Sequence, residues 1–173
     1  GENKGGACDC RDDAFVMKLS TVDGSVQWIK QIGDVSELEE ESSGQEDHCK
    51  GIAVDDSGVY CAGYTRGSFG ETHGGSLDAF VMKLSKDNGE LSWIKQIGDV
   101  SEPEEGASRN QDYCQAVAVG ENGVYCAGFA YGSFGEANGG GKDAFVMKLS
   151  KVDGRLDWIK QVGYESERAE GTS

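Results

Sequence analysis

One stretch of sequence recurs three times in this chain at a constant spacing of 65 residues. The string AFVMKLS places its phenylalanine at Phe15, Phe80 and Phe145, and aligning the three copies requires no insertion or deletion. A constant period of this length predicts propeller blades, a solenoid or another array, because each unit can bury its apolar faces only against a neighbouring copy. The repeat therefore constrains the fold more strongly than any local motif does.

Each period contains segments with the character of short β-strands, which are CKGIAV at 49–54, GVYCAGYT at 58–65, DAFVMKLS at 78–85 and LSWIKQIG at 91–98. The linkers between them, DDSG and KDNGE, predict hairpin turns. We expect KDNGE, and the VDG segments of the other copies, to form two-residue turns whose glycine or asparagine adopts a positive φ. The content of 27 glycines and 1 proline agrees with many short strands joined by tight turns.

Both faces of the DAFVMKLS segment are largely apolar. Phe80, Met82 and Leu84 alternate with the smaller Ala79 and Val81, whereas a sheet with one wet face alternates apolar with polar residues. Sheets that stack face to face, as in a propeller, bury both faces. We therefore predict an all-β fold built from four-stranded antiparallel, propeller-type blades.

The order of the motifs resembles the SBBP repeat, a β-propeller repeat of secreted and surface proteins. The resemblance rests on WIKQIG, an acidic linker, GIAVDDSGVYCAGYT, GSFG and GGSLDAFVMKL, and it extends over about 13–163. It implies that CKGIAV is the innermost strand of a blade, followed outward by GVYCAGYT, DAFVMKLS and LSWIKQIG. Cys61 and Cys126 depart from the family pattern, which usually has an apolar residue there.

This arrangement divides the chain into a lead with a CxC motif at 1–12, an outer half-blade at 13–33, blades at 49–98 and 114–163, and a tail at 164–173. About two and a half blades cannot close a ring, and open ends leave apolar faces bare. The chain also lacks an initiator methionine, which suggests a processed or excised piece. We expect its partners to be further blades of a longer chain or copies of itself.

Two cysteine pairs recur with the repeat, each on neighbouring strands of one predicted hairpin: Cys49 with Cys61, and Cys114 with Cys126. In the simplest register Cys49 lies three residues beyond the position opposite Cys61, so a β-bulge is needed to bring the sulfurs together. We predict an intrablade disulfide for each pair, with buried free thiols as the alternative. Zinc is not expected, because His48 and His73 have no histidine counterpart one period later.

Cys8 and Cys10 have no counterpart in the repeat. We predict that they link this piece to a preceding segment or to another chain through an inter-segment or interchain disulfide. Together the cysteines favour an oxidising compartment, and hence an extracellular or cell-surface location.

The net charge of −15 makes nucleic acid an unfavourable partner. No apolar run approaches the length that spans a bilayer, so membrane insertion is not expected. The acidic loops hold oxygen donors for Ca²⁺ at Asp34, Glu37, Asp99 and Glu102, although without EF-hand spacing, and solvated charge is the alternative. No other cofactor is expected.

Nothing in the sequence indicates a catalytic site. No GxSxG motif follows a strand, and neither histidine recurs as a general base would in each blade. We therefore predict that the protein is not an enzyme. An aspartate recurs just before each AFVMKL string, and we expect it to accept backbone hydrogen bonds from the turn at the strand start: Asp13, Asp78 and Asp143. A tryptophan also recurs once per period, and we expect it to pack between blades rather than to form a glycan-stacking ladder: Trp28, Trp93 and Trp158.

The sequence is compatible with two functions. The first is an extracellular structural scaffold whose blades assemble within a longer chain or between subunits, as in a surface layer, appendage or fibre. The second is a secreted binding module that recognises a glycan or protein through its variable acidic loops, because the loop at 34–48 differs from that at 99–113 while the strands stay constant.

Overall fold

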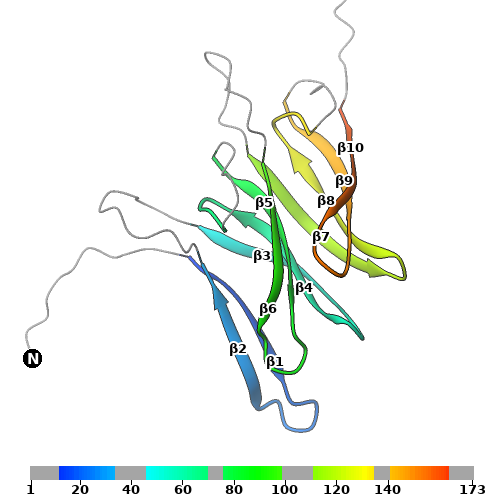
Figure 1. The fold of residues 1–173 in the computed structure, drawn as a ribbon. Coiled ribbons are helices and arrows are strands. Elements are labelled where there is room, and N and C mark those ends of the chain that lie inside the picture. Colours follow the sequence, from blue (N-terminus) through cyan, green and yellow to red (C-terminus); the bar gives the residue numbers. More distant parts are fainter. Residues whose placement is uncertain (1–11, 34–45, 70–75, 99–110, 135–140, 164–173) are drawn as a thin grey trace, which may run out of the picture.

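The computed structural model describes residues 12–33, 46–69, 76–98, 111–134 and 141–163. Within these ranges the regular elements are β-strands, and they form three antiparallel sheets (Figure 1). The first sheet is the hairpin of β1 (Ala14–Leu19) and β2 (Val26–Ile32). The second contains β3 (Asp47–Asp55), β4 (Gly58–Thr65), β5 (Asp78–Leu84) and β6 (Leu91–Ile97). The third contains β7 (Asp112–Gly120), β8 (Gly123–Ala130), β9 (Asp143–Leu149) and β10 (Leu156–Val162).

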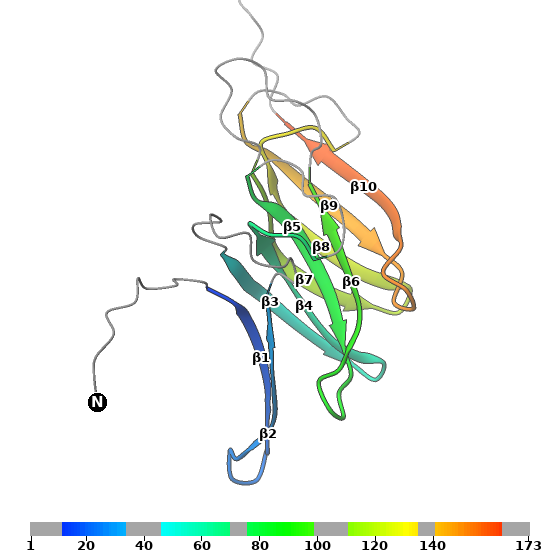
Figure 2. The same cartoon turned by 60° about the vertical axis from the view of Figure 1, so that its left-hand side comes forward.

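Each four-stranded sheet is a simple meander in which every strand pairs with the next one along the chain. Figures 1 and 2 show the three sheets stacked in chain order, with the β3–β6 sheet between the other two. The predicted all-β fold with four-stranded antiparallel sheets is therefore confirmed. None of the described segments forms a helix with the length and apolar character needed to cross a membrane.

The middle sheet is buried on both faces, as the apolar pattern predicts. Phe80, Met82 and Leu84 of β5 are completely buried, and so are Ala79 and Val81 on the opposite face. The first set packs against the β1–β2 hairpin, and the second packs against the β7–β10 sheet. Burial on both faces follows directly from the position of this sheet between two others.

The outer hairpin turns differ from the sequence-based prediction. The β5–β6 turn has four residues, Lys86 to Gly89, because Ser85 N donates to the Glu90 carbonyl oxygen at 2.8 Å and Gly89 N donates to the Ser85 carbonyl oxygen at 3.0 Å. Among the residues of this turn, Gly89 alone has a positive φ, of 72°, and Asn88 does not. The predicted two-residue turn was therefore wrong: the longer loop satisfies the Ser85 carbonyl internally and requires the left-handed region only at its final glycine.

Candidate assembly interface

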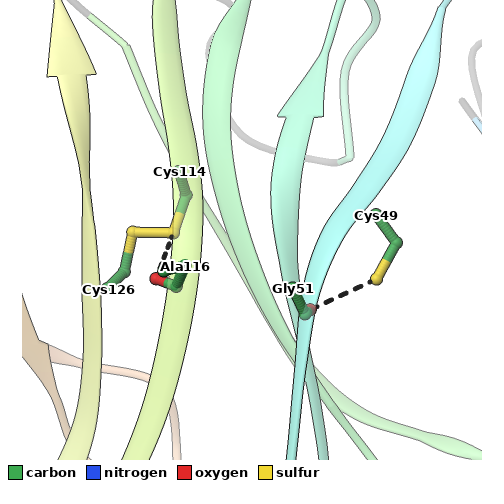
Figure 3. Close-up of a disulfide and its surroundings, with 5 residues drawn as sticks. All are labelled: Cys49, Gly51, Cys114, Ala116 and Cys126. Atoms are coloured by element: carbon green, nitrogen blue, oxygen red, sulfur yellow. Dashed lines mark hydrogen bonds between the residues drawn. A yellow bond between two sulfur atoms is a disulfide. The ribbon is translucent and has the colours of Figure 1, made fainter.

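Both intrablade cysteine pairs are disulfides in the structure. Cys49 is bonded to Cys61 and Cys114 to Cys126, with 6.0 Å between the Cα atoms of each pair. Figure 3 shows the second bond joining β7 to β8, with the Cys114 sulfur 3.5 Å from the Ala116 carbonyl oxygen.

The bulge required by these disulfides is present. Ile52 pairs with Cys61, but the register shifts between Cys49 and Gly51, so that Cys49 lies opposite Gly63. A side chain at Gly63 would overlap the His48 carbonyl oxygen, and the same holds at the equivalent position of the next sheet. A glycine on β4 therefore lets the bulged strand come close enough for the sulfurs to meet.

The remaining candidate site residues lie outside the described ranges. They are Cys8, Cys10, Asp34, Glu37, Asp99 and Glu102. Within the described ranges, no three histidine, cysteine, aspartate or glutamate side chains gather as metal ligands would.

The contacts between sheets use two chemically distinct faces. We call the side of each sheet that carries Trp93 or its equivalents the tryptophan face, and the side that carries Phe80 or its equivalents the phenylalanine face. In the first contact, the tryptophan face of the β1–β2 hairpin packs on the phenylalanine face of the middle sheet. In the second, the tryptophan face of the middle sheet packs on the phenylalanine face of the β7–β10 sheet. Both contacts thus have the same polarity along the chain.

A tryptophan and a lysine join neighbouring sheets in the same way at both contacts. Trp93 Nε1 and Lys83 Nζ both donate to the Lys151 carbonyl oxygen, at 3.2 and 2.9 Å, in the β9–β10 turn of the next sheet. The Trp93 ring also lies on Gly154, where an added Cβ would be 2.6 Å from ring atom Cε3. The indole can therefore pack on this turn only because the turn residue is a glycine, which has no side chain.

The first contact repeats this geometry one period earlier. Trp28 Nε1 and Lys18 Nζ donate to the Lys86 carbonyl oxygen at 3.1 and 3.0 Å, and the Trp28 ring covers Gly89. These contacts favour packing between sheets over a glycan-stacking ladder for Trp28 and Trp93. The constant spacing of Trp28, Trp93 and Trp158 was visible in the sequence, but the acceptor in the next turn was not.

A second polar contact joins the middle and last sheets. Lys151 Nζ in the β9–β10 turn lies 2.7 Å from Asp55 Oδ2 at the end of β3. Partial burial raises the pKa of Asp55, but hydrogen bonds from Lys151 and Ser57 outweigh this effect and lower the pKa from the ordinary 3.8 to about 2. The ion pair raises the pKa of Lys151 in turn.

Sequence reasoning missed a buried glutamine that organises each four-stranded sheet. Gln96 is 3% exposed; its Nε2 donates to Asp78 Oδ2 at 2.7 Å and to the Gly67 carbonyl oxygen at 3.0 Å, and its Oε1 accepts from Phe69 N at 2.8 Å. Gln161 makes the same three bonds in the next sheet. The 65-residue spacing of Gln31, Gln96 and Gln161 was the signal available in the sequence.

At the β1–β2 end of the stack the phenylalanine face is uncovered. Phe15 is 57% exposed and Met17 is 41% exposed, whereas Phe80 and Met82, which occupy the same positions in the middle sheet, are fully buried. Local sequence does not explain this difference, because the AFVMKL strings are identical. The difference arises because no sheet covers this face in the described structure.

At the opposite end the tryptophan face is uncovered. Val146 is 42% exposed and Trp158 is 44% exposed, whereas the equivalent Val81 and Trp93 are 0% and 9% exposed. The stack therefore has an uncovered phenylalanine face at one end and an uncovered tryptophan face at the other. At both internal contacts, a tryptophan face packs on a phenylalanine face.

Aromatic side chains form a row across the ends of the four inner strands. The ring centroids of His48 and Tyr64 are 4.9 Å apart, those of Tyr64 and Tyr113 are 4.7 Å apart, and those of Tyr113 and Phe129 are 4.6 Å apart. Lys142 Nζ lies 3.5 Å from the centroid of Phe129. Burial raises the pKa of Tyr64 and of Tyr113.

Stacked four-stranded antiparallel sheets of a repeating sequence define the chain as a β-propeller-type repeat protein. In agreement, residues 27–70 match the SBBP family, described as a beta-propeller repeat. The match begins in β2 and continues past β4, and therefore includes the outer strand of one unit and the inner hairpin of the next. Residues 27–70 are thus similar to an SBBP repeat. No curated protein matches the chain.

Proposed function

We propose that this protein is a non-catalytic, extracellular structural scaffold whose blades assemble with further blades of the same repeat, either of a longer chain or of other copies. The observation that carries the proposal is the pair of uncovered faces, because each matches a face that is buried inside the stack. Exposed apolar surfaces of this kind commonly mark interaction sites.

The unpaired edge of β1 supports the same proposal. The equivalent strand β5 pairs with β4 on one side and β6 on the other, whereas β1 pairs only with β2 within the described ranges. A groove of about 380 Å³ lies between β1 and β3 where such a partner strand would fit. The incoming blade would therefore supply strands as well as an apolar face.

The two disulfides support the extracellular part of the proposal, because disulfides persist in oxidising compartments. Alkylation of the protein in its native source, without reductant, is the measurement. We expect Cys49, Cys61, Cys114 and Cys126 to be protected. Full alkylation of these thiols would instead place the protein in a reducing compartment.

Light scattering in non-reducing buffer over a concentration series tests assembly. We expect masses above the 18.4 kDa of one chain, and Val146→Glu should return the protein to a single chain because it places a charge on the tryptophan face. Val152→Glu is the matched control, because Val152 is 85% exposed in a turn. A mass of one chain for the wild-type protein at every concentration would contradict assembly between copies.

The aromatic row favours a second candidate function, a secreted binding module. Tyr64 and Tyr113 lie where the acidic segments join the inner strands, and aromatic rings beside polar groups suit the apolar faces of sugars as well as protein side chains. The test is a glycan array probed with the wild-type protein and with a Tyr64→Ala, Tyr113→Ala double variant. Binding of a glycan class by the wild-type protein alone would support this function, and equal signals from both proteins would contradict it.

A further inference from the structure

We infer that Tyr64 and Tyr113 form a modification site, at which a peroxide-derived one-electron oxidant joins the two rings as dityrosine. The new bond ties the middle sheet covalently to the last sheet of the same chain. Both tyrosines lie inside the described stack, so the site does not depend on what covers either end of it.

The two rings meet across the contact between neighbouring sheets. Tyr64 is on β4 of the middle sheet and Tyr113 is on β7 of the last sheet. Their centroids are 4.7 Å apart with an interplanar angle of 70°, so the edge of one ring meets the other. Dityrosine forms at the ring edge, between the carbons ortho to the two phenol oxygens. Rotation of the side chains, rather than movement of the sheets, therefore brings the reacting carbons together.

Backbone hydrogen bonds between the two sheets fix this proximity. Asp112 N donates to the Leu77 carbonyl oxygen at 2.8 Å, and Leu77 and Gln111 form a parallel bridge. Tyr113 follows Asp112 in β7, and its hydroxyl donates to Gln111 Oε1 at 3.1 Å. Groups held as neighbours react as if each were present at a very high concentration. Two radicals formed at this site therefore combine with each other in preference to radicals on other chains.

This pair differs from the other tyrosines of the described ranges in access and in neighbour. Tyr64 and Tyr113 are both half-buried, so a small oxidant reaches them, whereas Tyr60 is completely buried. The remaining tyrosine rings lie beside a tryptophan or phenylalanine ring, at 6.1 to 6.3 Å: Tyr60, Tyr125 and Tyr131. Coupling is therefore expected between residues 64 and 113.

The reaction balances with one peroxide bond. Each phenol loses one electron and its hydroxyl proton and becomes a phenoxyl radical. The two radicals form a carbon–carbon bond between their ortho carbons, and the two ortho hydrogens move through solvent to the phenol oxygens, which restores both aromatic rings. The peroxide bond accepts the two electrons and breaks; with hydrogen peroxide, which also takes up the two protons, the by-product is water. The chain becomes lighter by two hydrogen atoms.

Mass spectrometry of the folded full chain tests the site. The probe is a photo-excited ruthenium tris-bipyridyl complex with persulfate, a peroxide, applied to dilute protein that is then reduced, alkylated and digested with trypsin. We expect a chain that keeps the size of a single chain on a denaturing gel and loses the mass of two hydrogen atoms. Its digest should contain a peptide in which 51–66 is linked to 110–142, with the fluorescence of dityrosine.

Two conservative variants locate the bond. Tyr64→Phe and Tyr113→Phe each keep the ring and remove the phenol oxygen, and each should abolish the linked peptide. Phe129 occupies the position of Tyr64 in the last sheet, so the repeat itself shows that phenylalanine fits there. Tyr131→Phe is the matched control, because it removes the same atom from the same tryptic peptide, and the link should persist.

Unfolding in urea provides a second readout. A cross-link between residues 64 and 113 closes a long loop and restricts the unfolded chain, so oxidation should raise the urea midpoint of the wild-type protein. The midpoint of Tyr64→Phe should not rise on the same treatment.

Three results overturn the inference. They are the absence of the linked peptide when free tyrosine treated in parallel forms dityrosine, a link that persists in Tyr64→Phe or Tyr113→Phe, and dityrosine that joins only separate chains. None of them bears on assembly through the uncovered faces, which light scattering tests separately.

Discussion

Gly63 shows how one residue can determine whether two strands come close enough for a disulfide. It lies opposite Cys49 at the bulge, where the β3 backbone comes so close that a side chain would overlap the His48 carbonyl oxygen. The obstacle is backbone rather than a flexible side chain, so it cannot move without disturbing the pairing of β3 with β4. The disulfide between Cys49 and Cys61 depends on this close approach.

Gly63→Ala should therefore destabilise the protein by about 1–3 kcal/mol, the usual cost of inserting a methyl group into a tightly packed site. Urea unfolding monitored by circular dichroism measures the loss, and thiol titration of the refolded protein should show more free cysteine than the wild type. Gly120→Ala is the matched control, because an added Cβ there first meets the side chain of Tyr125 at 3.2 Å. It should stay within about 1 kcal/mol of wild type, and an equal loss in both variants would contradict the argument.

Gln96 links the three outer strands of a blade. Its side chain connects β6 to Asp78 at the start of β5 and to the segment that follows β4, through Gly67 and Phe69. Buried polar groups need such partners, because an unsatisfied donor or acceptor retains its full desolvation cost. The recurrent aspartate thus has a structural role, because Asp78 Oδ2 accepts a hydrogen bond from the buried Gln96 amide.

Gln96→Leu should lower the free energy of unfolding by about 2–4 kcal/mol, because it leaves the Phe69 N–H, the Gly67 carbonyl and the Asp78 carboxylate without this partner. Gln31→Leu makes the same chemical change in the exposed β1–β2 hairpin, where Gln31 donates to Asp13. It should cost less than about 1 kcal/mol. Chemical denaturation of both variants gives the comparison, and similar losses would show that burial does not decide the effect.

Across the whole molecule, Asp55 and Lys151 connect sheets that are far apart in sequence. Asp55 ends β3 and Lys151 lies in the β9–β10 turn, so the ion pair fixes the middle and last sheets relative to each other in addition to the apolar packing. The pKa of Asp55 is lowered to about 2 in the folded protein. The stabilisation is therefore fully present above the unfolded pKa near 3.8, and it is lost as the pH falls through about 2.

Asp55→Asn should reduce the urea midpoint of unfolding at neutral pH, and the difference from wild type should narrow as the pH falls from about 4 toward 2, because protonation removes the charge from wild-type Asp55 as well. Equilibrium unfolding at a series of pH values measures this difference. Asp56→Asn, at the next position, is the control. Asp56 lies 3.6 Å from Lys86 Nζ but is fully exposed, so water screens this ion pair and the variant should follow the wild type. A difference that does not change with pH would rule out the ion pair as the cause.

The exposure of the two ends of the stack is also a property of the whole molecule. Neither Phe15 nor Val146 is unusual in sequence, and each has buried counterparts at the same position of another unit. Their exposure is a property of position in the stack and not of the local sequence.

The sequence by itself determined the strands and their order, because short apolar runs bounded by turn residues, repeated with a constant period, can be read along the chain. It also identified the need for a bulge at Cys49, since register can be counted along one hairpin. The turn length at Lys86 to Gly89 and the acceptors of Trp28 and Trp93 were decided only by tertiary structure. Three identical AFVMKL strings have different burial because a residue's exposure depends on the sheet that stacks on it, and no local sequence encodes whether that neighbour is present.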